Sequence, residues 1–245
     1  MDKVKIKTNE VGFTDYKIDL TKSMDVFLIT NGRNSFKYVF KSLERQKDVK
    51  FNLNIIRDVK WIDACNACLE YSDLPMYLRL DDDMILHPMA LQFFNHFVNN
   101  RLQDDAVIYC LKLWEPWNSR LANKVKVYVR KLTKEIGFET DDRGKVDKIF
   151  IKNSKRKKYK IIGDKTSAIG IHAACSFDDN MKYIKLRKGE RNRSDFEIRK
   201  KEIIYLDEVL KQTPLDKQLS MADKDLARFN IERNTWFGKF LNEHK

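Results

Sequence analysis

The sequence has little of what marks several large protein classes. Its 245 residues include only 8 Gly and 4 Pro, which excludes collagen-like and Gly/Pro-rich low-complexity chains. No run approaches the roughly 18 apolar residues that a membrane-spanning helix needs. The first five residues alternate in charge and lack an apolar core, so we expect no secretory signal. A globular chain is favoured, and its 42% hydrophobic residues suffice for one sizeable core.

Cysteine is also scarce, with four residues: Cys65, Cys68, Cys110 and Cys175. Cys65 and Cys68 have CxxC spacing, but the chain offers no second pair to complete a zinc site. The stretch around them has the pattern of an amphipathic helix. We therefore expect small buried thiols in a reducing compartment, which predicts a cytoplasmic location.

Positive charge, by contrast, is abundant and uneven. The chain carries 48 Lys and Arg against 36 Asp and Glu, a net charge of +12. Residues 1–110 have a net charge of −1, whereas residues 111–245 have +13. The second half therefore predicts an anion-binding surface, with nucleic acid, anionic lipid and phosphorylated small molecules as candidate partners.

In the first half, short apolar runs alternate with segments of helical periodicity. We expect strands at 24–30, 51–56, 76–80 and 106–111, and helices at 35–46, 61–71 and 88–97. Near-continuous apolar strands joined by helices predict an α/β fold related to the Rossmann fold, with a mainly parallel sheet covered by helices. Ligands of such sheets bind beyond the carboxyl ends of the strands, where Thr30, Asp58 and Asp81 fall.

The second half is less regular. Residues 124–130 alternate as in a strand, although a helix also fits, and residues 148–162 predict a hairpin with a basic tip at 153–158. The apolar run 168–175 predicts a buried strand. A capping box at 194–197 predicts a helix towards Leu210, and a last helix is expected from Ser220 onward. We expect one domain over 1–245, with halves at 24–115 and 116–245 and a helical C-terminal appendage.

Three consecutive aspartates, Asp81, Asp82 and Asp83, follow the strand predicted at 76–80. Adjacent carboxylates repel one another unless a cation lies between them, and Mg²⁺ or Mn²⁺ accepts such oxygens while leaving positions for phosphate. Strand geometry would place Asp81 and Asp83 on one side and Asp82 elsewhere. A solvated acidic turn is the alternative interpretation.

The run from Met76 to Leu86 resembles the DxD region of glycosyltransferases with the GT-A fold, in a family-2-like form. Residues 26–31 resemble the first strand of that fold, and residues 54–58 the second. The resemblance covers 24–115 and implies a nucleotide-diphosphate-sugar donor, a Mn²⁺ or Mg²⁺ cofactor and hexosyl transfer in surface glycan synthesis. The acceptor it implies is a saccharide or a lipid-linked molecule.

The resemblance also implies roles for particular residues. The donor-binding set is Thr30, Asn31, Arg33, Asp58, Asp81 and Asp82, with Asp58 at the nucleobase. Asp81 and Asp83 are the implied metal ligands, and His172 is a third. A hydrogen-bonded core histidine is an equally good interpretation of His172.

Further residues are candidates from their setting. Glu115 follows a predicted strand and lies between Trp114 and Trp117, an apolar setting that suits a general base for an inverting enzyme. The two indoles could stack on an acceptor sugar. Lys165 and Arg33 could assist the departing diphosphate. A retaining mechanism would need no such base.

Three other hypotheses stay open. Clustered carboxylates also serve nucleotidyltransferases, and a pI near 9.4 suits a nucleic-acid-binding protein, although the chain shows no recognised nucleic-acid module. The basic run Lys155–Lys158 and the aromatic residues of the last helix suggest peripheral association with the inner face of a membrane. The helix residues in question are Trp236, Phe237, Phe240 and Leu241.

Overall fold

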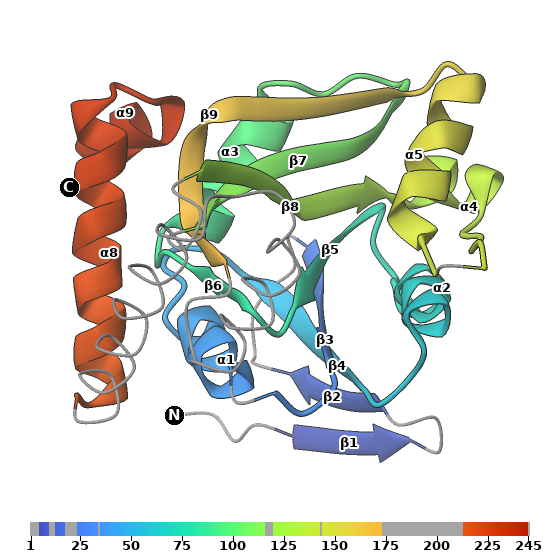
Figure 1. Ribbon diagram of the computed structural model, residues 1–245, viewed down its shortest axis with the longest axis horizontal. Helices are drawn as coiled ribbons and strands as arrows, with labels where there is room; N and C mark the ends of the chain where they lie inside the picture. Colours follow the sequence, from blue (N-terminus) through green and yellow to red (C-terminus); the bar gives the residue numbers. More distant parts are fainter. Residues whose placement is uncertain are drawn as a thin grey trace, which may run out of the picture.

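The computed structural model describes residues 5–9, 13–17, 24–33, 35–115, 120–142, 144–172 and 213–244 (Figure 1). The strands are β1 Lys5–Asn9, β2 Phe13–Lys17, β3 Met24–Thr30, β4 Phe51–Arg57, β5 Met76–Asp81, β6 Met84–Leu86, β7 Ala106–Glu115, β8 Arg120–Val129 and β9 Lys160–His172. The helices are α1 Phe36–Glu44, α2 Trp61–Tyr71, α3 Ala90–Asn99, α4 Arg130–Ile136, α5 Val146–Arg156, α8 Leu215–Glu232 and α9 Trp236–Glu243.

The strands form one sheet in the order β1-β2-β4-β3-β5-β8-β7-β9-β6. Its centre is parallel as predicted, because β3 pairs in parallel with both β4 and β5, and β7 pairs in parallel with β9. The remaining neighbours pair antiparallel. The α/β class is confirmed, and β4, β3 and β5 lie side by side with the three aspartates where β5 ends.

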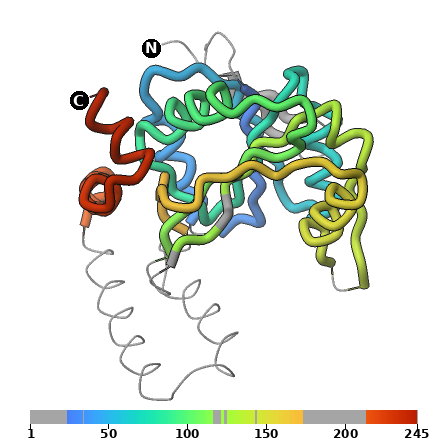
Figure 2. Tube along the Cα trace, turned by 90° about the horizontal axis from the view of Figure 1, so that it is seen from above, coloured from blue at the N-terminus to red at the C-terminus, as the bar shows by residue number. Residues whose placement is uncertain are grey.

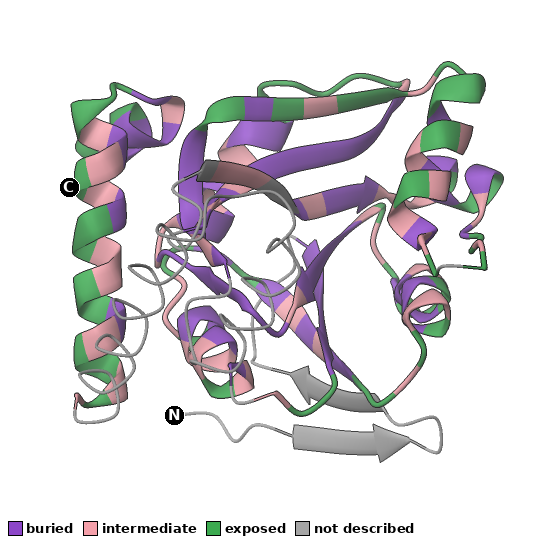
Figure 3. Cartoon of the chain, in the orientation of Figure 1, coloured by how far each residue is buried: buried purple, intermediate pink, exposed green. Residues whose placement is uncertain are grey.

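Helices cover both faces of the sheet, which explains why its central strands are apolar throughout. Every residue of β3 is buried (Figure 3). One core cluster packs α1, α3 and α9 against the sheet, and a second packs α2, α4 and α5 against the opposite face. Burial on both faces removes the alternation of apolar and polar residues that a half-exposed strand would show.

The hairpin predicted across 148–162 is wrong, since α5 occupies Val146–Arg156. Val146, Phe150 and Ser154 recur every four residues and form the buried face of this helix. Asp147 lies in its first turn and Lys155 and Arg156 in its last, where their charges suit the helix dipole. The basic run therefore lies at the C-terminal end of a helix and not at the tip of a hairpin.

The other predictions for the second half fare better. Residues 124–130 lie in strand β8 up to Val129, and β9 includes the apolar run as far as His172. Residues 173–175, which include Cys175, and the capping box at 194–197 lie outside the described residues. In the described part of the chain, no helix combines the length and apolar character needed to cross a bilayer.

The predicted C-terminal appendage is present, but as two helices. Asn234 has a φ of 49° and separates α8 from α9, and the Thr235 side chain caps α9 by accepting a hydrogen bond from the Gly238 N–H. Phe237, Phe240 and Leu241 are buried, and Trp236 packs on Phe93 and Phe97. Phe237, Phe240 and Leu241 are therefore not available to enter a membrane, because they form part of the core with α3, and Trp236 is partly buried against the same core.

Candidate functional site

The ends of three parallel strands meet at one edge of the sheet, as predicted. The Asp58 N–H donates to the Thr30 carbonyl over 3.1 Å, so the residue after β4 adjoins the end of β3. Asp81 pairs with Ile29 in the register of β3 and β5. Thr30, Asp58 and Asp81 thus lie on neighbouring strands at the carboxyl edge, where parallel α/β sheets bind ligands.

Strand β5 ends at Asp81, and Asp82 and Asp83 form the turn that leads to β6. Both turn aspartates are buried, with 3% and 2% of their surface exposed. Asp82 Oδ2 accepts a hydrogen bond from Thr30 Oγ1 at 2.7 Å and another from the Asn31 N–H at 3.2 Å. The expectation that Asp82 faces elsewhere is wrong, because strand alternation stops where the turn begins.

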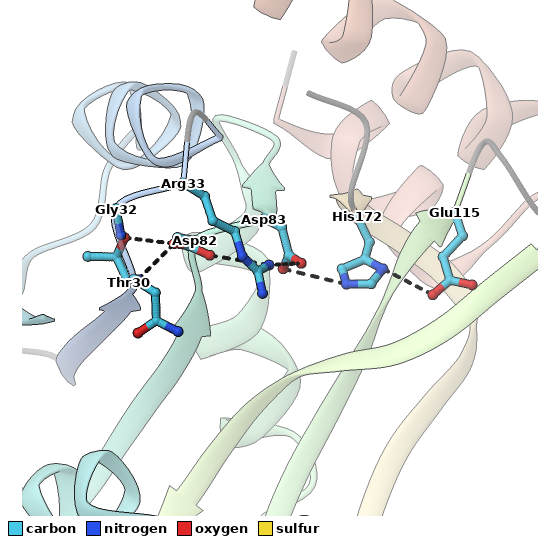
Figure 4. A network of polar contacts seen from close by, with 8 residues as sticks. Thr30, Gly32, Arg33, Asp82, Asp83, Glu115 and His172 are labelled. Atoms are coloured by element: carbon cyan, nitrogen blue, oxygen red, sulfur yellow. Dashed lines mark hydrogen bonds and ion pairs between the residues drawn. The ribbon is translucent and has the colours of Figure 1, made fainter. Parts of the chain in front are cut away.

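Arg33 lies over both turn aspartates (Figure 4). Its Nη1 donates to Asp83 Oδ2 at 2.9 Å and lies 3.5 Å from Asp82 Oδ1. Gly32, with a φ of 74°, precedes it and donates its N–H to Thr30 Oγ1. The short segment after β3 therefore brings a guanidinium to two adjacent buried carboxylates.

His172 and Glu115 extend this network on the other side of Asp83. His172 ends β9 and pairs with Met84 of β6. Its Nε2 lies 3.5 Å from Asp83 Oδ1, and its Nδ1 lies 3.0 Å from Glu115 Oε1. Figure 4 shows the side chains in one row, from Thr30 and Arg33 through the aspartates to Glu115. Residues far apart in sequence are thus brought into one line.

A glycine permits the close approach of β6 and β9 that places His172. A Cβ on Gly170 would lie 2.2 Å from the Ile85 carbonyl oxygen. No larger residue fits there without moving one of the two strands. The turn after β5 and the end of β9 are therefore held together next to the His172–Asp83 contact.

Asp81 belongs to a different charged cluster. It follows Arg79 by two residues on β5 and so shares its side of the strand. Arg79 is buried, donates to Asp147 at 2.6 Å and lies over the rings of Trp61 and Tyr128. Burial raises the pKa of Asp81 to about 6, while Arg79 opposes the rise and Asp83 adds to it.

This second cluster was missed in the sequence. Lys126 also donates to Asp147, and although burial opposes it, Arg79 and Lys126 hold the pKa of Asp147 well below its usual range. The one sequence feature that pointed to this cluster is Arg79, a charged residue inside an otherwise apolar strand. The partner Asp147 is 68 residues away in sequence, so pattern alone could not name it.

Two other predicted residues, Lys165 and Trp114, have side chains that contact residues outside the row. Lys165 is exposed on β9 and lines a cavity of about 270 Å³ with Cys110, Lys126 and Asp164. Trp114 packs on Phe229 with ring centroids 5.1 Å apart. Trp117 lies outside the described residues. The position of Lys165 therefore does not support its proposed role at the diphosphate.

The predicted metal site is represented by two residues. Among the side chains that the structure describes, no group of three or more His, Cys, Asp or Glu is arranged to hold a metal ion. Asp83 and His172 nevertheless adjoin, and a carboxylate on the second ring nitrogen is the usual setting of a metal-binding histidine. Mg²⁺ commonly uses one or two carboxylates plus substrate phosphates, so this donor set fits a divalent ion.

Comparison with known proteins gives distant structural neighbours. No protein-family model and no curated protein matches the chain. A crystal structure of S. aureus TarS residues 1–349 aligns over 76% of this chain and 71% of its own, with 15% identity and a TM-score of 0.48. The same fragment in complex with UDP-GlcNAc gives 14% identity and 0.47, over 76% of this chain and 72% of its own.

A putative glucose-1-phosphate thymidylyltransferase from Bacillus anthracis covers 70% of this chain and 79% of its own, with 14% identity and a TM-score of 0.39. These values identify neither an activity nor a substrate for this chain.

Proposed function

We propose that this chain is a metal-dependent glycosyltransferase that uses a nucleotide-diphosphate-sugar donor. The observation that carries the proposal is the row Arg33, Asp83, His172 and Glu115 at the carboxyl edge of the sheet. Two buried carboxylates, a histidine and a guanidinium in one place suit a ligand with phosphates and a divalent cation.

Each residue of the row has a proposed role. Asp83 and His172 would hold the Mn²⁺ or Mg²⁺, which supplies positive charge that offsets the charge building on the departing diphosphate. Asp82 is held by Thr30 and the Asn31 N–H, and so orders the loop that faces the donor. Arg33 would bind phosphate oxygens, as guanidinium groups do through paired hydrogen bonds.

The second cluster and the strand ends would shape the nucleoside side of the site. Asp81 would accept a hydrogen bond from the ribose, and exposed Asp58 would contact the nucleobase. Trp114 and Trp117 stay the residues proposed to stack on the acceptor sugar. A nucleotidyltransferase is the second candidate, because buried carboxylates beside an arginine serve a nucleoside triphosphate equally well.

The test is calorimetry of the full chain with nucleoside diphosphates and triphosphates, each with and without Mn²⁺. We expect a diphosphate to bind only with Mn²⁺, and Asp83→Asn to abolish that binding. Asp104→Asn, an exposed carboxylate between α3 and β7, is the matched control. Binding of no diphosphate in Mn²⁺ would overturn the proposal, and pyrophosphate release from a triphosphate would favour the second candidate.

A further inference from the structure

Each carboxylate oxygen of Asp83 lies close to a nitrogen of a neighbouring side chain. Oδ2 accepts from Arg33 Nη1 at 2.9 Å, and Oδ1 lies 3.5 Å from His172 Nε2. A divalent ion that binds Asp83 brings its charge next to both nitrogens and competes with Arg33 for Oδ2. The neighbour that costs less free energy to move is the one that a metal ion would displace.

Burial and anchoring separate the two neighbours. The His172 side chain is 2% exposed, and its other ring nitrogen is held by Glu115 at 3.0 Å. The Arg33 side chain is 33% exposed and follows an exposed glycine. Moving a partly solvated arginine into water costs little, whereas moving a buried imidazole would break a second buried contact.

The charge balance indicates why Arg33 is there at all. Asp82 and Asp83 are adjacent and buried, and like charges at such a distance are unfavourable without a cation. Arg33 Nη1 lies within 3.5 Å of an oxygen of each. The guanidinium therefore supplies the positive charge that this pair requires in the metal-free chain.

We propose, on the basis of the function proposed above, that Arg33 couples metal binding to diphosphate binding. In the metal-free chain its guanidinium neutralises Asp82 and Asp83. A divalent ion on Asp83 displaces it, and the released guanidinium pairs with the diphosphate of the donor. Arg33 thus weakens the binding of metal alone and strengthens the binding of nucleotide to the metal-loaded chain.

The experiment measures Mn²⁺ binding by electron paramagnetic resonance, which needs no turnover, on the wild type and Arg33→Ala. Without nucleotide, we expect Arg33→Ala to bind Mn²⁺ about fivefold more tightly, because a competing ion pair is lost. In saturating Mn²⁺, we expect its Kd for UDP to rise about tenfold. Arg33→Lys keeps the positive charge without the planar guanidinium, so we expect its affinities for Mn²⁺ and for UDP to lie between those of the wild type and of Arg33→Ala.

Arg228→Ala is the matched control, since it removes one exposed positive charge on α8 and should change neither constant. Arg33→Ala should also unfold at lower urea than the wild type without Mn²⁺, and Mn²⁺ should reduce that difference. Unchanged or weaker Mn²⁺ binding in Arg33→Ala would overturn the coupling, while Asp83-dependent Mn²⁺ binding of the wild type would leave the proposed function intact. A wild type without Asp83-dependent Mn²⁺ binding would overturn both.

Discussion

The Glu115 carboxylate lies 3.0 Å from Nδ1 of His172, and both side chains are buried. An ionised carboxylate only accepts hydrogen bonds, so Nδ1 is assigned the proton, and Nε2, which faces Asp83, is the ring nitrogen that would bind a metal ion. A divalent ion bound by Asp83 Oδ1 and by Nε2, which lie 3.5 Å apart, would use a ring that Glu115 orients through its other nitrogen. Glu115 is thereby favoured as a residue that positions His172, rather than as the general base suggested by its place between two tryptophans.

Substitution at Glu115 separates the two roles. If Glu115 positions His172, Glu115→Ala should weaken Mn²⁺ binding about 10- to 100-fold, and Glu115→Gln should weaken it less because the amide oxygen still accepts from Nδ1. If Glu115 is the base, Glu115→Gln should stop transfer and leave Mn²⁺ binding unchanged. Mn²⁺ titration by electron paramagnetic resonance, paired with a turnover assay, distinguishes these outcomes.

Asp58 is expected to contact the nucleobase, and its backbone dictates the variant to use. Its φ of 54° is a conformation that Asn adopts readily and Ala does not. Asp58→Asn should therefore keep the fold and raise the donor KM more than it lowers kcat. Asp58→Ala should lose about 1 kcal/mol of stability as well. An unchanged donor KM in Asp58→Asn would show that Asp58 does not contact the donor.

Asn230 fastens the C-terminal helices to β9, four residues before His172. Its side-chain amide donates to the Ala168 carbonyl at 2.8 Å and accepts from the Ala168 N–H at 3.0 Å, so it pairs with β9 as a neighbouring strand would. It is fully buried and also accepts from Thr235.

Asn230→Ala should reduce the free energy of unfolding by about 3 kcal/mol, because it leaves buried backbone groups without partners. Urea unfolding measures this, and the exposed Asn242, substituted by Ala, is the control. A loss below about 1 kcal/mol would mean that water replaces the amide.

How much was predictable depended on whether a residue's partners were local. The strands ending at Thr30, Arg57 and Asp81 followed from apolar runs, since both faces of those strands are buried. The α5 helix was misread because Ile149 and Ile151 favour strands individually, whereas its buried face is defined by Val146 and Phe150. A buried residue at every fourth position is the pattern of a helix, and this pattern outweighed the strand preference of the two isoleucines.

The residues of the site likewise divide into those that the local sequence predicts and those that depend on distant partners. The aspartates were visible because they follow a strand, but their directions depended on a turn that no periodicity describes. The pairing of Glu115 with His172 joins strand ends 57 residues apart and required the register of β6, β7 and β9.

His87 predicts a pH dependence of stability. Burial lowers the pKa of His87 to about 4, with Arg45 and Lys47 contributing, so the folded chain keeps this ring neutral. The unfolded chain takes up a proton near pH 6.5, and stability from this group is lost as the pH falls from about 6.5 to 4. The total is about 3 kcal/mol.

Urea unfolding between pH 7 and 4.5 should therefore show a flatter pH profile for His87→Gln than for the wild type. The comparison concerns slopes, so a uniform loss of packing against Phe237, whose ring centroid is 5.4 Å away, does not disturb it. Parallel profiles would show that His87 is not the group responsible.

The basic end of the molecule provides the last prediction. Residues 130–160 hold 12 Lys and Arg against 5 Asp and Glu, and Lys155, Arg156 and Lys158 are exposed. Figure 2 shows this segment at the opposite end of the molecule from α8 and α9. Because Phe237 and Phe240 of α9 are buried, we expect membrane association of the described part of the chain to be electrostatic and to involve the end formed by α4 and α5.

Vesicle co-sedimentation tests this directly. We expect binding to anionic vesicles at low salt, none to neutral vesicles, and loss at high salt, since each basic side chain near an anionic surface contributes about 1 kcal/mol. Replacing Lys155 and Lys158 by Gln should weaken binding roughly 30-fold, since each 1.4 kcal/mol is a factor of ten. The same change at the exposed residues Lys217 and Lys224 of α8 should have little effect. If the wild type ignores anionic vesicles at low salt, the excess charge serves another anion, such as a phosphorylated acceptor.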